Sequence, residues 1–146
     1  MTYGSINPSA LVTFTISMKV TQDILDNLTS QAKKCKRLRI SMDMRTSSDD
    51  QSQRMLNAVE PGTQIPIHRH RDSAETVIIV RGRLIERFYN DEGNITDEII
   101  MEVGGECSVL QIPKGQWHSI EVLESGTVIF EAKDKAYIPL GIEDLM

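Results

Sequence analysis

Hydrophobic and polar residues alternate with a period of two over most of the chain, which is typical of β-strands with one buried face. The predicted strands are RLRISMDM (37–44), RMLNAVE (54–60), ETVIIVR and RLIERFY on either side of Gly82, ITDEIIMEV (95–103), ECSVLQI (106–112), QWHSIEVL (116–123) and TVIFEAK (127–133). Polar or glycine-containing turns separate them, among them a hairpin turn at NDEGN (90–94). Short strands divided in this way predict a sandwich or a small barrel.

One segment near the N-terminus has helical periodicity instead. Thr21 precedes QDILDNLTSQAKKCKR (22–37) as a candidate N-cap, and apolar residues then recur every three or four positions. These apolar residues are Val20, Ile24, Leu25, Leu28, Ala32 and Cys35. We expect this stripe to pack on the outside of the sheet. Before the helix, LVTFTISM (11–18) alternates and predicts a further strand, which could form the edge of a homodimer.

Composition and charge narrow the class of protein. With 146 residues, 40% hydrophobic and 25% charged, the chain is long enough for one globular domain with its own core. The net charge of −5 argues against binding to nucleic acid or to an anionic membrane surface. The basic run at 33–39 is interpreted as a solvated helix end. We find no signal peptide or membrane span, and two distant cysteines indicate a reducing compartment, so we expect a cytoplasmic protein.

Two of the three histidines, His68 and His70, are separated by one residue. On a strand such residues point to the same face, and a pair of imidazoles is a common start of a transition-metal site. Alone, this short pattern is more often incidental. Glu75 directly precedes TVIIV, a run apolar on both faces, and a buried carboxylate must pair or bind an ion. A salt bridge to a nearby arginine (Arg69, Arg71 or Arg81) is the alternative.

The third histidine, His118, lies in PKGQWHS. It shares strand parity with Ile120 and Val122, which marks its face as the inner one. An isolated inward histidine is usually an ordinary core residue. Here all three histidines lie at two strand entries marked by glycine and proline, which favours one shared site.

These residues resemble the two motifs of the cupin superfamily. GTQIPIHRHRDSAETVIIVRG (62–82) resembles the first motif, and PKGQWH (113–118) the second. The resemblance implies a mainly β fold, a double-stranded β-helix or jelly-roll barrel, here with one N-terminal helix. It also implies one divalent transition metal (Fe, Mn, Ni or Zn) held by His68, His70, Glu75 and His118. Val122 stands where cupins often have asparagine, a position that is not usually a ligand.

Over most of its length the chain also resembles the WbuC family of small bacterial cupins, some encoded in O-antigen polysaccharide clusters. The expected organisation is a single cupin domain at 1–146, with an N-terminal strand and helix (1–36), a barrel (37–135) and a C-terminal tail (136–146). The leading hypothesis is a metal-dependent enzyme, isomerase- or epimerase-like or oxygenase-like, that acts on a small molecule such as a sugar derivative. The resemblance to the WbuC family implies the link to polysaccharide metabolism.

Two other functions remain open at this stage, an Fe(II)-dependent dioxygenase and a non-catalytic small-ligand binding or sensor module. No catalytic residue is identified from the sequence. The candidate substrate-binding residues are Arg39, Arg54, Tyr89, Gln111 and Gln116.

Overall fold

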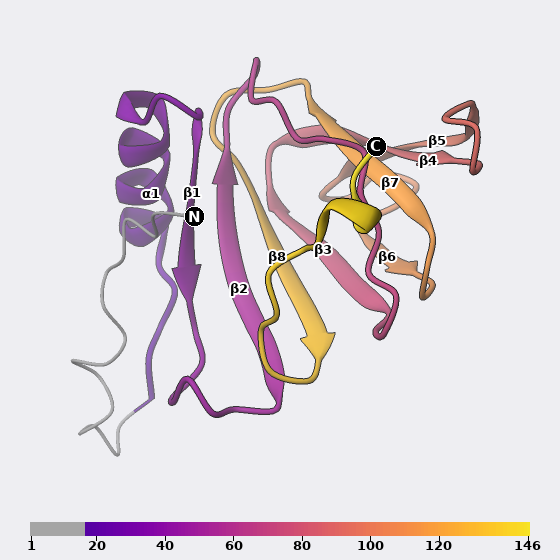
Figure 1. The fold of residues 1–146 in the computed structure, drawn as a ribbon. Coiled ribbons are helices and arrows are strands. Elements are labelled where there is room, and N and C mark those ends of the chain that lie inside the picture. The colour runs from indigo at the N-terminus through magenta and orange to yellow at the C-terminus, as the bar shows by residue number, and fades with distance from the viewer. Residues whose placement is uncertain (1–16) are drawn as a thin grey trace.

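The computed structural model describes residues 17–146, which form one α-helix and two antiparallel β-sheets (Figure 1). The elements are α1 (Gln22–Lys34), β1 (Arg39–Asp43), β2 (Ser52–Val59), β3 (Glu75–Arg81), β4 (Arg83–Tyr89), β5 (Ile95–Glu102), β6 (Val109–Ile112), β7 (Trp117–Val122) and β8 (Thr127–Asp134). Each strand within this range matches a run that the alternating pattern predicted. The mainly β fold with one preceding helix is therefore confirmed.

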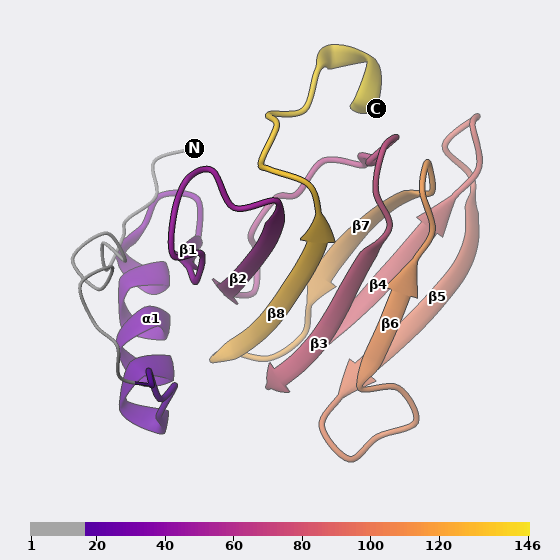
Figure 2. The same cartoon turned by 90° about the horizontal axis from the view of Figure 1, so that it is seen from below.

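The strands form a five-stranded sheet in the order β1-β2-β8-β3-β6 and a three-stranded sheet in the order β5-β4-β7. Figure 2 shows the two sheets facing each other, with α1 outside the larger one. Strands β3 and β4 follow one another through Gly82, whose φ of +84° suits glycine. A Cβ at this position would lie 2.6 Å from the Cα of Thr127, so no other residue fits without a backbone shift.

The helix begins and packs as its sequence predicts. The Thr21 hydroxyl accepts a hydrogen bond from the backbone N–H of Ile24 (3.4 Å), as an N-cap does. Helix α1 ends at Lys34, three residues earlier than the predicted end. Cys35 has already left the helical conformation (ψ 134°), and its N–H closes the last turn on the carbonyls of Ala32 and Gln31.

The hydrophobic residues form two separate layers. The first lies between α1 and the outer face of the five-stranded sheet, and its buried members are Leu25, Leu28, Ala32, Met42, Leu56, Ala58 and Val128. The second lies between the two sheets, and its buried members are Val77, Ile79, Leu84, Met101, Ile112 and Ile129. Met42 of β1 and Leu56 and Ala58 of β2 therefore face the helix. The opposite faces of these strands carry polar residues, together with Met55 and Val59, toward the space between the sheets.

The segment after β8 returns across the barrel. In Figure 1 it runs back over β8, and near its end Leu145 forms a bridge with His68. A single 3-10 turn at Ile142–Asp144 precedes the last residues, and the backbone N–H of Met146 donates to the carbonyl of Ile67 (2.9 Å). The C-terminal segment is therefore joined to the stretch that carries the first two histidines.

Three sequence expectations concern features beyond these elements. The strand predicted at 11–18 lies, apart from its last two residues, outside the described range, so the homodimer edge stays a prediction. Cys35 and Cys107 are both free thiols. Among residues 17–146 no helix is long and apolar enough to cross a membrane.

Candidate metal centre

The His68–His70 segment lies between β2 and β3 and is not part of a regular strand. Only His68 forms a bridge to β7, by donating to the carbonyl of His118 (3.0 Å) and accepting from its N–H (2.9 Å). Pro66, which has no N–H, interrupts the ladder two residues earlier. A single bridge nevertheless places the first and second motifs side by side.

The three histidine rings converge from these two segments. The ring centroids are 4.2 Å apart for His68 and His118, 5.2 Å for His68 and His70, and 5.7 Å for His70 and His118. One nitrogen from each ring lies within 4.8 Å of the corresponding atoms of the other two. Such a cluster can hold a metal ion.

Backbone carbonyls orient two of the rings. Nδ1 of His68 lies 2.9 Å from the carbonyl oxygen of Pro66, and Nδ1 of His118 lies 2.8 Å from that of Gln116. Each Nδ1 therefore carries the proton and donates, which leaves the lone pair on Nε2 for a ligand. Burial, together with the neighbouring His118 ring, lowers the pKa of His68 to about 4. His68 is thus neutral at physiological pH, the form that binds metals.

Glu75, the first residue of β3, brings a carboxylate to the same cluster. Its side chain is almost fully buried, and Oε2 lies 3.2 Å from Nε2 of His70 and 3.4 Å from Nε2 of His118. Oε2 has no hydrogen-bond donor among the described residues. Burial by itself would raise the pKa of Glu75, but positive charge on its neighbours, His118 and His70 in their protonated forms and Lys133, holds the pKa well below its usual value.

The alternative partners of Glu75 are occupied elsewhere. Arg69 and Arg71 both pair with Asp144, and Arg81 pairs with Asp26. A buried, ionised carboxylate oxygen without a donor, next to imidazole nitrogens with free lone pairs, suits a cation between them. Three nitrogens and one oxygen are a donor set that Zn, Fe, Mn and Ni accept. The residues present therefore fit a divalent transition metal, although they do not select one.

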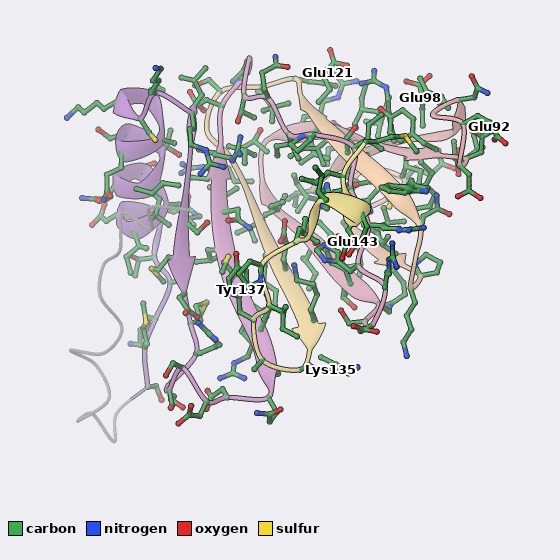
Figure 3. The ribbon with its side chains drawn as sticks, in the orientation of Figure 1. Glu92, Glu98, Glu121, Lys135, Tyr137 and Glu143 are labelled. Carbon is green, nitrogen blue, oxygen red and sulfur yellow. The ribbon has the colours of Figure 1, made fainter. Side chains whose placement is uncertain are left out.

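The cluster opens into a cavity of about 260 Å³ between the two sheets. Its polar lining residues come largely from the inner faces of the strands and are Arg39, Ser41, Gln53, Asn57, Glu86, Glu131 and Lys133. Hydrogen bonds join some of these side chains across strands: the Ser41 hydroxyl on β1 donates to Oδ1 of Asn57 on β2 (2.5 Å). The exposed residues of the lining form the cavity mouth and are Arg37, Pro66, Tyr137, Ile138 and Leu140. Figure 3 shows Tyr137 on the C-terminal segment, over β2 and β8.

Two carboxyl groups in this lining were missed from the sequence. Glu86 on β4 is fully buried, and its Oε1 has no hydrogen-bond partner among the described residues. Burial, then the charges of Glu75 and Glu131, raise the pKa of Glu86 well above its usual value. Burial and the charge of Glu75 raise the pKa of Glu131 to about 8. The available signal was a glutamate at the inward parity of RLIERFY and of TVIFEAK.

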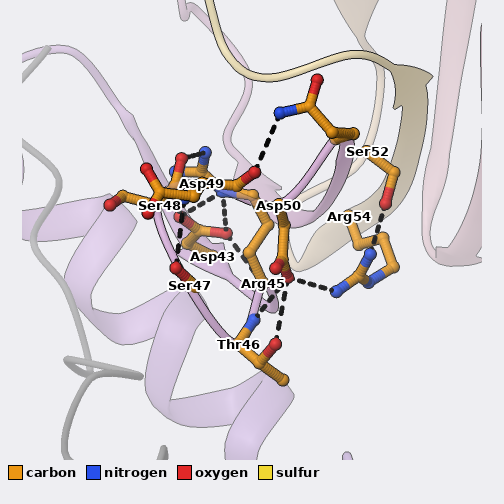
Figure 4. A network of polar contacts seen from close by, with 10 residues as sticks. Asp43, Arg45, Thr46, Ser47, Ser48, Asp49, Asp50, Ser52 and Arg54 are labelled. Atoms are coloured by element: carbon orange, nitrogen blue, oxygen red, sulfur yellow. Dashed lines mark hydrogen bonds and ion pairs between the residues drawn. The ribbon is translucent and has the colours of Figure 1, made fainter.

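Of the five candidate substrate-binding residues, Arg39 lines the cavity and Arg54 does not. The guanidinium of Arg54 pairs with Asp50 (3.0 Å) and also contacts the Ser52 hydroxyl. Figure 4 shows this network in the loop that leads into β2. Arg54 thus orders a loop on the outside of the barrel.

The other three candidates also lie away from the cavity lining. The Tyr89 hydroxyl bonds to that of Ser119 (2.9 Å) on the outer face of the three-stranded sheet. Gln111 is exposed on β6 and accepts a hydrogen bond from the Thr76 hydroxyl (2.6 Å). Gln116 donates to the carbonyl of Tyr89 (3.0 Å) and so joins the second motif to β4. Tyr89 and Gln111 lie on strands at positions that face away from the cavity, because neighbouring strand residues face opposite ways.

Comparison with solved structures assigns the fold to a class. The chain is similar to the capsular polysaccharide assembling protein CapF of Staphylococcus aureus (TM-score 0.56, 23% identity, covering 68% of this chain and 27% of CapF). It is similar to a mutant of Bacillus subtilis oxalate decarboxylase OxdC (TM-score 0.53, 20% identity, covering 69% of this chain and 26% of OxdC). It is also similar to the cupin domain of Schizosaccharomyces pombe Cnp3 (TM-score 0.54, 11% identity, covering 66% of this chain and 64% of the Cnp3 chain). The two sheets and the histidine cluster between them define a cupin-fold protein with a candidate metal site.

A narrower assignment comes from the sequence families. Residues 20–101 match the family described as "Domain of unknown function (DUF6016)", and the chain belongs to this family. The chain spans about a quarter of the length of CapF and of OxdC, so the resemblance to them concerns one part of each. No curated protein sequence matches the chain.

Proposed function

We propose that this protein is a metal-dependent cupin enzyme that acts on a small molecule, most specifically a sugar derivative. The observation that supports it is the convergence of His68, His70 and His118 with the donor-free oxygen of Glu75, beside a polar cavity. A buried site of this composition is costly for the fold unless a cation binds there. The cavity supplies room for a small organic ligand next to the cluster.

The protein's own groups have distinct roles in this proposal. The four ligand residues hold a divalent ion, which when bound supplies a Lewis acid or lowers the pKa of a water molecule. Glu131, with a pKa of about 8, holds a proton at neutral pH and can give or receive one at a ligand in the cavity. Asn57, which accepts a hydrogen bond from the Ser41 hydroxyl (2.5 Å), adds a polar group to the same lining. The apolar residues of the mouth, Ile138 and Leu140, limit the access of water.

The sugar part of the proposal depends on resemblance. The sequence resembles the WbuC family, and the fold is similar to CapF, which is described as a capsular polysaccharide assembling protein. Fold similarity at this level of identity is a weak guide to chemistry. The substrate class therefore needs a direct test.

The test begins with metal analysis of protein purified without a chelating step, followed by a screen of sugar phosphates and nucleotide sugars with product detection by mass spectrometry. We expect one transition-metal ion per chain and turnover that His118→Ala abolishes. If metal-loaded protein converts none of these compounds, the sugar assignment is wrong. Oxygen uptake by the Fe(II) form would instead favour a dioxygenase, and tight ligand binding without product would favour a binding or sensor module.

A further inference from the structure

Two arginines at the start of β1 line the cavity and lie close together. Arg37 is exposed at the mouth, and Arg39, the first residue of β1, is partly buried. Burial lowers the pKa of Arg39 below its usual value, and the positive charge of Arg37 lowers it further. Two like charges therefore act on each other at one corner of the cavity, where their repulsion is only partly screened.

The Arg39 guanidinium is held by neutral groups. Its Nη1 donates to the Thr63 hydroxyl (3.2 Å) and to the carbonyl of Gln64 (2.7 Å), while the Thr63 hydroxyl donates to the carbonyl of Arg37 (2.7 Å). No hydrogen bond from Nε or Nη2 of Arg39 to residues 17–146 is formed. The loop after β2 therefore fixes the position of the guanidinium but leaves two of its nitrogens without a protein acceptor.

These two arginines differ from all the others in the chain. Every other arginine forms an ion pair with a carboxylate, namely Arg45, Arg54, Arg69, Arg71, Arg81, Arg83 and Arg87. Neither Arg37 nor Arg39 has such a partner between residues 17 and 146. The remaining segment, 1–16, contains no aspartate or glutamate that could provide one. In a chain with a net charge of −5, two adjacent arginines without a carboxylate indicate an external anion.

The positions of the acidic and basic residues determine where in the cavity an anionic group of a ligand is favoured. Glu75 and Glu86 are buried deep in the cavity lining, whereas Arg37 is at the mouth. The third cation of the lining, Lys133, lies opposite Glu75 in the register of β3 and β8, so its charge is offset locally. In the metal-free protein an anionic group is thus favoured at the arginine corner, whereas the inner end presents the buried Glu75 carboxylate.

We propose that Arg37 and Arg39 form an anion subsite that holds a phosphate or carboxylate group of the ligand, while the uncharged remainder extends toward the histidines. Guanidinium groups bind either oxyanion through two parallel N–H donors, which suits this corner. The assignment deepens the proposed function and rests on it for the identity of the whole ligand. The anion subsite itself consists of residues that do not take part in the metal cluster.

The subsite is tested with inorganic phosphate and acetate as probes, titrated into full-length protein and followed by NMR of the backbone amides of Arg37 and Arg39. Metal-free protein is the main sample, so that binding to an ion does not contribute. We compare wild type with Arg37→Gln, Arg39→Gln and the double variant. Arg83→Gln is the matched control, since Arg83 is a half-exposed arginine paired with Glu102 outside the cavity lining.

We expect the preferred anion to bind the double variant at least about tenfold more weakly, the loss that one charge-assisted hydrogen bond represents, and to bind Arg83→Gln as it binds wild type. The tighter of the two probes identifies the group as phosphate or carboxylate. Equal affinities in wild type and Arg37→Gln/Arg39→Gln, or no binding of either anion to wild type, would overturn the proposal. Arg37→Gln alone remains informative if Arg39→Gln misfolds, because the Arg37 side chain has no hydrogen bond within residues 17–146.

The metal measurement separates the two proposals. If the anion binds at the arginines but the protein binds no metal, the subsite stands and the proposed enzyme does not. If the metal binds and neither anion does, the subsite is wrong while the metal centre remains.

Discussion

The backbones of His68 and His118 exchange hydrogen bonds in both directions, and this pair brings two histidines that are far apart in sequence into one cluster. Because the contact uses main-chain atoms only, it does not depend on either side chain. The imidazoles of these two residues are consequently placed by the fold of the main chain.

His118→Ala should abolish stoichiometric metal binding without unfolding the barrel. The substitution removes one ring nitrogen but keeps the backbone pair with His68. Elemental analysis gives the metal content, and circular dichroism checks the β structure. Gln111→Ala, an exposed change on β6, is the control that should bind metal normally. Unchanged metal content in His118→Ala would remove this residue from the ligand set.

Glu131→Gln should change how stability depends on pH. The pKa of Glu131 is raised to about 8 from an ordinary value of 4.5. Between these values the folded protein holds a proton that the unfolded chain has released, so this group makes metal-free wild type less stable as pH rises. Its contribution is fully present below the unfolded pKa and is lost by about pH 8.

The neutral glutamine lacks this dependence. Relative to wild type, metal-free Glu131→Gln should therefore be more stable at about pH 9 than at about pH 5, as measured by urea unfolding. Glu92→Gln, in the exposed turn between β4 and β5 (Figure 3), is the control. The same stability difference at both pH values would show that Glu131 titrates normally.

Asp144→Asn should loosen the C-terminal segment while leaving the metal site intact. Oδ1 of Asp144 accepts from Nε of Arg69 (3.1 Å) and of Arg71 (2.5 Å), and these contacts, working against burial, lower the pKa of Asp144. A neutral amide weakens both contacts. The backbone N–H of Met146 should then exchange faster with deuterium.

Glu143→Gln is the matched control for this change. The backbone carbonyl of Glu143, rather than its carboxylate, accepts from Arg69 and Arg71, so the substitution keeps those contacts. Equal exchange at Met146 in Asp144→Asn and Glu143→Gln would show that the ion pairs do not hold the segment.

Leu28→Ala should destabilise the protein without weakening the metal site in the folded state. Leu28 is fully buried between α1 and the five-stranded sheet. Truncation of such a residue lowers the free energy of unfolding by about 2–5 kcal/mol, because it leaves a cavity in a packed layer. Urea unfolding measures this loss, and Lys33→Ala at an exposed position of the same helix should have little effect. A metal affinity that falls with Leu28→Ala would mean that the helix also supports the site.

Local patterns were sufficient to predict most of the fold. Strand alternation and the NDEGN turn follow from side-chain direction and turn chemistry, which neighbouring residues determine. The Thr21 cap and the buried face of α1 could be predicted for the same reason. The predicted end of the helix was three residues too late. The basic residues after Lys34 are typical of a helix end in composition, although the backbone has already left the helix at Cys35.

Residues of the site could be predicted from the sequence only where they belong to a motif with a characteristic spacing. The three histidines and Glu75 stand in recognisable motifs, but Glu86 and Glu131 lie in apolar strands that differ little from core strands. Whether an inward residue meets a core or a cavity depends on how the sheets pack, and this is a tertiary property. Tyr89 and Gln111 were candidate substrate-binding residues, but their strand parity turns them outward, where they bond to Ser119 and Thr76.

Because the hydrophobic layers are separate from the cavity, the structure also bears on how such a protein can evolve by substitution. The packing behind β1 and β2 and the layer between the sheets provide much of the burial, while the inner polar positions of β1, β2 and β8 carry few of those contacts. Exchanges among residues such as Ser41, Asn57 and Glu131 alter what the cavity binds while leaving those layers unbroken. A scaffold organised in this way can change its ligand by single substitutions while its metal ligands and packed layers are kept.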